Sequence, residues 1–461
     1  MDAYAMRLAI IGFILVIVLM VLLVREQFAP PVTFIVLPLI AAIAAGYSPS
    51  LIKTAINAGE KTMINTAVLF VFSIAYFTLM DEAGLFDPII NALVGKIGKS
   101  LTALFVVIVL VSMVAHLDGS GATTFLIGAT AFMPICKKIG VRPQALMCTI
   151  AITASAMNIM PWAGPTLRAS AMIATQPGFE TYEAGSQFTY MLPCWLFLIF
   201  TAFLTAVLVS RVEKKHGAGA LVVETAGEKE EEKKTKLEVS KGKYTFNAIL
   251  TIILLVCLFK DIGLPQYYLF MVAFSIALVA NLPKTADQKK KIKELGVNAM
   301  QMCMTLFAVG VFVGILTQNA VIDPAAEKLA YVDNTSMVDF MATLITNSVP
   351  SFVSSHLHWF LSLFSVPIMM MIGTDAFYYG LLPVVLAAVV PLGVDPRAVA
   401  AAMLLTATYG TFISPTVASV YVGLGICNES VGEHIKYSLR FMWPMSILSL
   451  IFATLIGVVK F

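Results

Sequence analysis

The segments ITASAMNIMPWAGPT (residues 152–166) and LTATYGTFISPTVAS (residues 405–419) each begin as an apolar helix and then reach a proline. The first segment contains Pro161, Gly164 and Pro165 within five residues, and such a run cannot continue a regular helix. The break frees backbone N–H and C=O groups, which survive at membrane depth only where protein buries them or where they line an aqueous cavity. The two segments therefore predict interrupted helices rather than ordinary lipid-facing ones.

The composition places these segments in a membrane protein. Of the 461 residues, 59% are hydrophobic and 12% are charged, whereas soluble domains carry about 25% charged residues. Apolar runs recur along the chain, and Gly, Pro, Thr and Ser interrupt those at 119–136 and 376–394, which we interpret as re-entrant hairpins. We expect an all-α, multi-pass protein of the inner (cytoplasmic) membrane with about 11 to 12 transmembrane helices.

A charged segment divides the chain. Residues 211–243 mix lysine, arginine and glutamate, and they separate a first transmembrane repeat (1–210) from a second one (244–461). A second lysine-rich stretch, 284–293, follows the first two apolar runs of the second repeat. The positive-inside rule places both basic loops in the cytoplasm.

The two halves resemble each other in sequence. FVFSIAYFTLMDEAGLFDP (70–88) aligns with LFAVGVFVGILTQNAVIDP (306–324), and GVRP (140–143) aligns with GVDP (393–396), in the same order. Many membrane carriers consist of two repeats that meet near the middle of the bilayer through discontinuous helices. If each repeat has an odd number of crossings, the two repeats have inverted topology.

Four polar segments depart from what lipid-facing helices need. They are HLDGSGATT (116–124), NIMPWAGPT (158–166), IGTDAFYYG (372–380) and YGTFISPT (409–416), which give one turn and one break in each half. Glycines let a ligand approach the backbone, and a helix start with free N–H groups favours an anion. The candidate substrate-binding residues are Gly119, Ser120, Gly121, Thr123, Asn158, Gly164, Thr166, Thr374, Thr411, Ser414 and Thr416. The candidates for proton or cation coupling are Asp118, Asp375 and His116, because ionisable groups within membrane spans are costly and mark functional sites.

The charged and polar residues of these segments also have structural roles as alternatives to binding or coupling. Asp118 and Asp375 can cap helices at a membrane edge, and His116 can pack as a satisfied core histidine. Arg168, which follows the first break, can pair with a carboxylate or extend to the lipid headgroups. His434 is expected to be solvated. Breaks at matching positions of the two halves, each flanked by hydroxyl groups, favour a binding site over simple kinks.

Four motifs resemble the bacterial citrate–metal:proton symporter (CitMHS) family of the ion transporter superfamily: HLDGSGATT, NIMPWAGPTLRASA (158–171), TDAFYYGLLP (374–383) and GEH (432–434). The resemblance covers most of the chain apart from the charged linker. It implies uptake of citrate complexed with Mg²⁺ or Ca²⁺, coupled to protons, by homodimers that work by an elevator motion. Ser120 stands where the family pattern often has a second acidic residue, so free citrate or another di- or tricarboxylate stays open.

Together these features predict a secondary transporter that imports citrate or a related di- or tricarboxylate by proton-coupled symport, without a resident cofactor or metal. The alternatives are a sodium-coupled carboxylate symporter and a sodium/proton antiporter, although hydroxyl-rich and glycine-rich segments argue against the antiporter. An enzyme is not expected, because the sequence has no HExxH motif and no aspartate pair at an interface. Nucleic acid is not expected as a partner, because basic residues flank apolar spans without interleaved aromatic residues. The six cysteines lie singly, with no CxxC pair.

Overall fold

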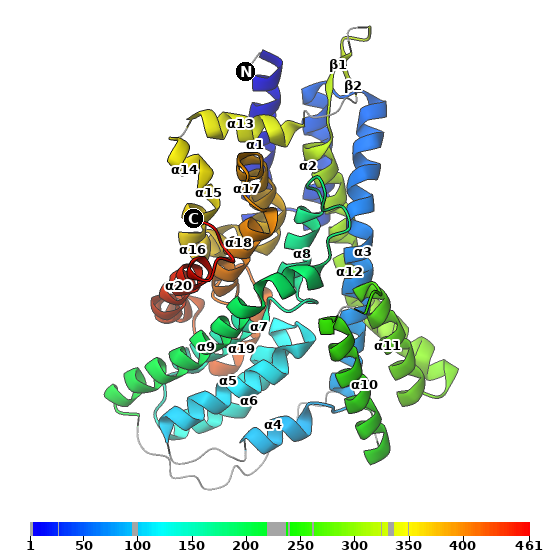
Figure 1. Ribbon diagram of the computed structural model, residues 1–461. Helices are drawn as coiled ribbons and strands as arrows, with labels where there is room; N and C mark the ends of the chain where they lie inside the picture. Colours follow the sequence, from blue (N-terminus) through cyan, green and yellow to red (C-terminus); the bar gives the residue numbers. More distant parts are fainter. Residues whose placement is uncertain are drawn as a thin grey trace.

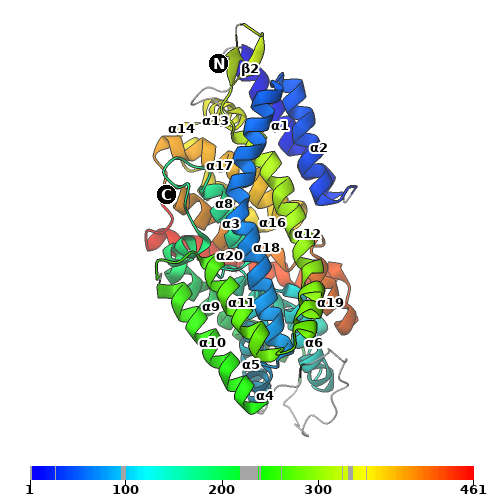
Figure 2. The same cartoon turned by 90° about the vertical axis from the view of Figure 1, so that its right-hand side faces the viewer.

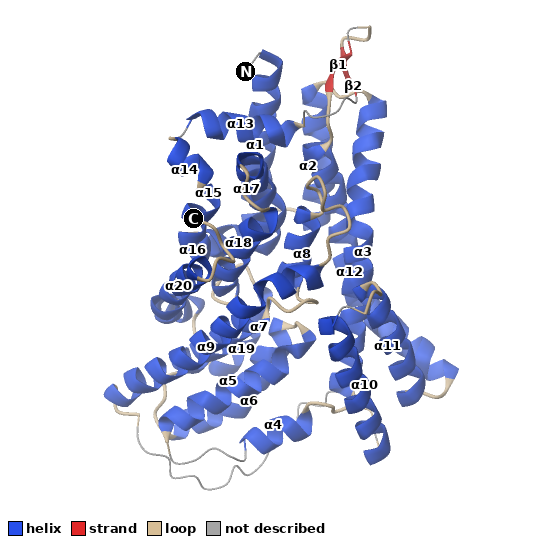
Figure 3. Cartoon of the chain, in the orientation of Figure 1, coloured by secondary structure: helices blue, strands red, loops and turns tan. Residues whose placement is uncertain are grey.

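The computed structural model of the chain consists almost entirely of helices (Figure 3). It describes residues 3–25, 27–94, 100–218, 237, 240–260, 262–323, 325–330, 336–348 and 350–461. Most of the predicted charged linker therefore lies outside the described residues. Within them, β1 (Val321–Asp323) and β2 (Lys328–Ala330) form a two-stranded antiparallel sheet.

The helices follow one another in two comparable series. The first series is α1 (Ala3–Val24), α2 (Pro30–Ala45), α3 (Pro49–Glu82), α4 (Asp87–Val94), α5 (Leu101–Ala115), the short η1 (His116–Asp118), α6 (Gly121–Lys138), α7 (Pro143–Met157), α8 (Gly164–Ile173) and α9 (Ala184–Lys215). The second series is α10 (Lys241–Lys260), α11 (Gln266–Asn281), α12 (Thr285–Thr317), α13 (Met337–Ser348), α14 (Ser351–Ser355), α15 (Leu357–Leu363), α16 (Ser365–Asp375), the π-helical η2 (Ala376–Leu381), α17 (Leu382–Val389), η3 (Val390–Leu392), α18 (Pro396–Thr411), α19 (Ala418–Cys427) and α20 (Val431–Leu455).

Length and composition identify the helices that can cross a membrane. Among the described residues, seven helical segments are long and apolar enough to do so, and several shorter apolar helices accompany them. The seven are Ala3–Leu23, Pro49–Glu82, Leu101–Asp118, Ala184–Lys215, Lys241–Leu258, Ser365–Leu392 and Val431–Leu455. The prediction of an all-α, multi-pass membrane protein is confirmed, whereas the total number of crossings stays a prediction.

Each series contains the same succession of elements. A pair of helices precedes one long helix, which has 34 residues in α3 and 33 residues in α12. A helical hairpin follows, which is α5–α6 in the first series (the first hairpin) and α16–α17 in the second (the second hairpin). Next comes a helix interrupted by a break (α7–α8 and α18–α19), and finally the long helix α9 or α20. Both interrupted helices begin at the proline of the aligned motifs, Pro143 and Pro396, because proline fits the first turn of a helix.

Equivalent helices of the two series run antiparallel. α3 and α12 lie side by side in both views (Figure 1, Figure 2). The start of α3 lies beside the sheet that follows α12, where the Ser48 N–H donates to the Leu329 carbonyl (3.2 Å). The end of α3 lies beside the start of α12, where Lys291 Nζ is 2.7 Å from Glu82 Oε2. This is the geometry that inverted repeats produce.

Glycines bring the backbones of α3 and α12 into direct contact. A Cβ atom at Gly314 would lie 2.0 Å from the Ala55 carbonyl oxygen, and one at Gly59 would lie 1.9 Å from the Gly310 carbonyl oxygen. Small residues at a helix crossing allow this close approach in membrane proteins. Because the facing atoms belong to the backbone, the crossing leaves no room for a side chain.

Gly314→Ala should therefore lower the thermal stability of the protein, because the added methyl group must displace the backbone of α3 at a cost of about 1–3 kcal/mol. Gly296→Ala is the matched control, since Gly296 lies in the same helix and a Cβ atom there would meet nothing within 4 Å. At that position the better helix propensity of alanine should stabilise the protein by up to about 1 kcal/mol. Thermal unfolding in detergent measures both effects, and equal melting temperatures would contradict the close crossing.

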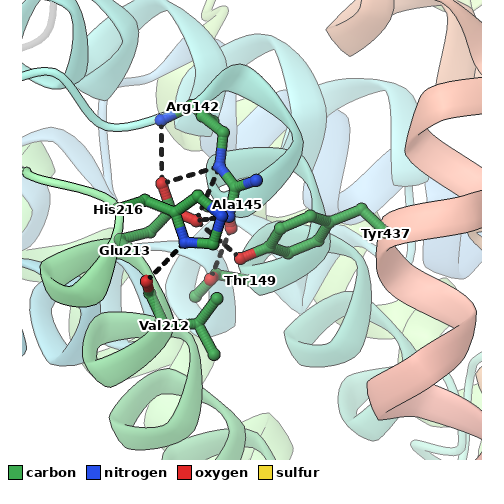
Figure 4. A network of polar contacts seen from close by, with 7 residues as sticks. All are labelled: Arg142, Ala145, Thr149, Val212, Glu213, His216 and Tyr437. Atoms are coloured by element: carbon green, nitrogen blue, oxygen red, sulfur yellow. Dashed lines mark hydrogen bonds and ion pairs between the residues drawn. The ribbon is translucent and has the colours of Figure 1, made fainter.

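An ion pair with a fully buried carboxylate anchors the start of the first interrupted helix (Figure 4). Arg142 immediately precedes α7, and both its backbone N–H and its guanidinium donate to the Glu213 carboxylate of α9, with Nη2 2.6 Å from Oε1. The Tyr437 hydroxyl of α20 donates to the same carboxylate at 2.8 Å. The Glu213 side chain is fully buried. One carboxylate thus joins α7, α9 and α20.

The second interrupted helix starts at the other end of α9. Gln187, in the first turn of α9, donates to the Arg397 carbonyl at the start of α18 (3.2 Å). Glu213 lies near the opposite end of α9, about 39 Å away at about 1.5 Å per helical residue. α7 and α18 therefore enter the protein from opposite sides. Their breaks meet between the two ends.

Candidate functional site

The first hairpin turns at Gly119, which has a left-handed φ of 71° that favours glycine. The Asp118 carboxylate accepts the Ser120 N–H at 2.7 Å, and the Ser120 hydroxyl accepts the Thr123 N–H at 3.3 Å at the start of α6. Asp118 and Ser120 therefore hold the turn through local hydrogen bonds. The N-cap of α6 is thus Ser120 and not Asp118, whose role in coupling stays a prediction.

His116, at the same turn, is fully buried. Its Nδ1 atom forms a hydrogen bond with the Thr124 hydroxyl (2.7 Å), and its ring packs edge-on against the ring of Phe412, with centroids 5.4 Å apart. A Cβ atom at the neighbouring Gly121 would lie 2.4 Å from Phe412 Cε1. The turn of the first hairpin is thus seated directly on the break of the second interrupted helix.

The first break connects α7 to α8. The Trp162 indole in this break donates to the Leu117 carbonyl of the first hairpin (2.9 Å). Asn158, which ends α7, is buried. Arg168, one turn into α8, folds its guanidinium back over Gly164, where a Cβ atom would lie 2.4 Å from Nη1. Gly164 therefore makes space for the arginine at the start of α8.

The second hairpin turns at Gly373, which also has a left-handed φ, of 75°. Two residues later, the Asp375 carboxylate accepts a hydrogen bond from Arg168 Nε at 2.8 Å. The Arg168 guanidinium carbon also lies 5.7 Å from the ring centroid of Phe70 and 5.9 Å from that of Tyr379, which is cation–π distance. Arg168 pairs with a carboxylate from the other half, as one of its two alternatives predicted.

The second break connects α18 to α19. The Ser414 hydroxyl lies 3.1 Å from the Met370 carbonyl of the second hairpin and 2.8 Å from the Thr416 hydroxyl. His434 Nε2 lies 3.0 Å from the Phe412 carbonyl, which is a free acceptor at the end of α18. His434 is fully buried, so the prediction that it is solvated is wrong. Packing of α20 against α18 buries it.

These contacts join the four polar segments in a closed ring. The first hairpin contacts the second break, and the second break contacts the second hairpin. The second hairpin contacts Arg168 of α8, just after the first break, and the first break contacts the first hairpin. The two interrupted helices also touch each other, because the Thr408 hydroxyl donates to the Ser155 carbonyl (2.7 Å). In Figure 1, α7, α8 and α18 accordingly lie in the middle of the molecule.

A cavity of about 450 Å³ opens at one side of this ring. Of the predicted site residues, Thr374, Asp375 and Thr416 line it, together with Arg168. The connection between α1 and α2, including Phe28 and Pro30, also lines the cavity, and no polar signal in the sequence pointed to this connection. The other predicted site residues do not line this cavity: Gly119, Ser120, Gly121, Thr123, Asn158, Gly164, Thr166, Thr411, Ser414, Asp118 and His116.

Several buried hydroxyl groups of the ring lack a hydrogen-bond partner among the described residues. They belong to Tyr378, Tyr379, Thr166 and Thr411. Buried polar groups in folded proteins are nearly always hydrogen-bonded. These hydroxyls lie on the second hairpin and the two interrupted helices, and none of the four residues lines the cavity. No group of three or more His, Cys, Asp or Glu side chains suited to a metal ion occurs among the described residues.

Comparison with known proteins identifies the family. The sequence model described as "Citrate transporter" matches residues 11–405, which is most of the chain. The chain belongs to the citrate transporter family. Membership confirms the predicted resemblance and the prediction of a multi-pass membrane transporter rather than an enzyme.

Relatives from Bacillus subtilis (strain 168) align with the chain almost from end to end. A protein named "Citrate transporter" is 30% identical over 98% of this chain and 100% of the relative. A protein named "Mg(2+)/citrate complex secondary transporter" is 28% identical over 98% of this chain and 99% of the relative.

Two solved structures share the fold at low sequence identity. The YdaH transporter of Alcanivorax borkumensis superposes with a TM-score of 0.60 at 12% identity, covering 89% of this chain and 88% of that one. MtrF of Neisseria gonorrhoeae, described as illuminating a class of antimetabolite efflux pumps, superposes with a TM-score of 0.55 at 14% identity, covering 91% and 84%. At these identities the comparison concerns the fold alone.

Proposed function

We propose that this member of the citrate transporter family imports citrate or a related di- or tricarboxylate by proton-coupled symport. One observation carries the proposal: Arg168 of the first interrupted helix lines a cavity together with the second hairpin and the second break. Guanidinium groups bind carboxylates through paired, charge-assisted hydrogen bonds. The hydroxyls of Thr374 and Thr416 on the same wall supply further hydrogen-bonding groups.

The charge of the cavity favours one form of the substrate. Among the described residues that line it, Arg168 supplies positive charge and Asp375 supplies negative charge. A citrate trianion bound to one divalent cation carries a single net negative charge, which one guanidinium can balance. The start of α19 adds a weaker positive potential, since Thr416 and Val417 of the lining lead directly into that helix. We therefore propose the Mg²⁺ or Ca²⁺ complex of citrate as the preferred substrate, with the metal carried as cargo.

Uptake of labelled citrate into proteoliposomes tests this function. With an inward proton gradient, we expect uptake that a protonophore abolishes and that Mg²⁺ increases. An inward sodium gradient alone should not drive it. Uptake driven equally well by sodium would replace the proton with sodium as the coupling ion, and no uptake of any di- or tricarboxylate would contradict the proposed substrate class.

A further inference from the structure

We infer that Arg168 receives a substrate carboxylate and that Asp375 is its built-in competitor, so that protonation of Asp375 releases Arg168 to the anion. This inference rests on the proposed function and adds a physical route for coupling. It assigns a binding role to Arg168, and it gives Asp375 a different task from that of Asp118, whose carboxylate holds its own turn.

The position of the pair supports an exchangeable contact. Arg168 Nε and Asp375 Oδ1 are 2.8 Å apart, yet the two side chains keep 15% and 24% of their surface exposed, and both line the cavity. A ligand in the cavity can therefore reach the guanidinium. The pair of Arg142 and Glu213 differs in the exposure of its carboxylate, because the Glu213 side chain is fully covered by protein.

The competition follows from charge and donor geometry. A substrate carboxylate and the Asp375 carboxylate need the same guanidinium N–H groups, and two carboxylates at one guanidinium leave a net negative charge in a partly desolvated site. A proton taken from solution onto Asp375 removes that repulsion. The ion pair with Asp375 is then replaced by an ion pair with the substrate. The net charge around Arg168 stays unchanged, and no covalent bond of the substrate changes.

The surroundings assign the pH response to Asp375. The titratable or charged groups that face the pair are Tyr378 and Tyr379, on the turn of η2 that follows Asp375. From α3, only the Phe70 ring faces the guanidinium among the described contacts. The remaining cavity wall, contributed by the α1–α2 connection and the second break, carries no charged side chain among the described residues. Of these groups, Asp375 is the carboxylate that holds Arg168, so the exchanged proton is assigned to Asp375.

This exchange links the proton to the substrate. With Asp375 ionised, the intramolecular pair satisfies Arg168 and the anion binds weakly. With Asp375 protonated and no anion present, Arg168 is a partly desolvated charge without a counter-ion, which is an unfavourable state. The favoured states are therefore those with both ligands bound or neither. This is the thermodynamic requirement for coupled transport.

Equilibrium binding of labelled citrate to the purified full-length protein, with saturating Mg²⁺, tests the exchange. Measurements cover pH values at which citrate is fully ionised. For the wild type, we expect the apparent Kd to increase by up to about tenfold per pH unit, because the fraction of binding-competent protein decreases by that factor. Asp375→Asn should bind at least as tightly with no pH dependence. In proteoliposomes the same variant should exchange internal for external citrate but lose accumulation driven by a proton gradient.

Variants of the arginine provide the second arm. Arg168→Gln should weaken binding by about 10- to 100-fold at every pH, the effect of losing hydrogen bonds to a charged group. Arg168→Lys should bind weakly but keep the pH dependence of the wild type. Arg397→Gln is the matched control, because Arg397 pairs with Asp395 (Nη2 to Oδ2, 2.6 Å) and neither residue lines the cavity. This variant should bind citrate as the wild type does.

Two results would overturn the inference: a wild-type pH dependence in Asp375→Asn, or a wild-type Kd in Arg168→Gln. If Asp375→Asn or Arg168→Gln does not fold, Arg168→Lys decides, since tight binding without pH dependence there would also overturn it. A wild-type protein that binds no carboxylate would instead overturn the proposed function, which keeps the two failures distinct.

Discussion

Arg142→Ala should lower the free energy of unfolding by about 3 kcal/mol, because it removes the counter-ion of a fully buried carboxylate and leaves that charge uncompensated. The Glu213 carboxylate is fully buried and accepts hydrogen bonds from the Arg142 backbone, the Arg142 guanidinium and Tyr437. Without the guanidinium, the carboxylate must take up a proton or attract water into the contact of α7, α9 and α20. Thermal unfolding and detergent size-exclusion profiles measure the loss.

The matched control is Arg397→Ala at the start of α18, the corresponding helix of the second half. Arg397 also pairs with a carboxylate, that of Asp395, which begins the same helix. The two arginines are similarly exposed, 41% for Arg397 and 35% for Arg142, but the Asp395 side chain is 24% exposed whereas that of Glu213 is fully buried. Exposed ion pairs contribute only about 0–1 kcal/mol. If both variants lose the same stability, the Arg142 pair is not the anchor that its burial indicates.

Gly121→Leu should reduce transport by about 100-fold, since displacing a well-oriented site by about 1 Å has effects of that order. A Cβ atom at Gly121 would lie 2.4 Å from Phe412 Cε1 and 2.7 Å from Ser419 Oγ. The leucine must therefore separate the first hairpin from the second break. Initial uptake rates, normalised to the amount of folded protein in proteoliposomes, measure the change.

Ala122→Leu controls for added bulk at the same turn. Ala122 is the next residue of α6 and is exposed, so a larger side chain there does not enter the contact with Phe412. We expect it to transport close to the wild-type rate. Equal rates in the two leucine variants would show that the contact between hairpin and break does not position the site.

Local backbone structure could be predicted from the sequence because its causes are local. Closely spaced prolines and glycines disfavour regular helix, so the break at 158–163 and the turn at Gly119 follow from the residues themselves. The apolar runs likewise predicted membrane helices, and the aligned motifs predicted that α7 and α18 begin at equivalent prolines. The membrane fold and the family therefore required no coordinates.

The contacts between the halves could not be predicted in this way. Asp118 and Asp375 look alike in sequence. Asp118, however, accepts a hydrogen bond within its own turn, whereas Asp375 pairs with Arg168, which lies 207 residues earlier in the chain. His434 was wrongly predicted to be solvated, because its burial depends on how α20 packs against α18.

The sequence by itself determined where helices run, where they break and which family the chain belongs to, since these depend on hydrophobicity and on the backbone restrictions of proline and glycine. Only the tertiary structure decided which charged groups meet, which hydroxyls are buried without partners and where the cavity opens. Those features depend on distances between segments that antiparallel packing of the two halves brings together, and no local pattern encodes such distances.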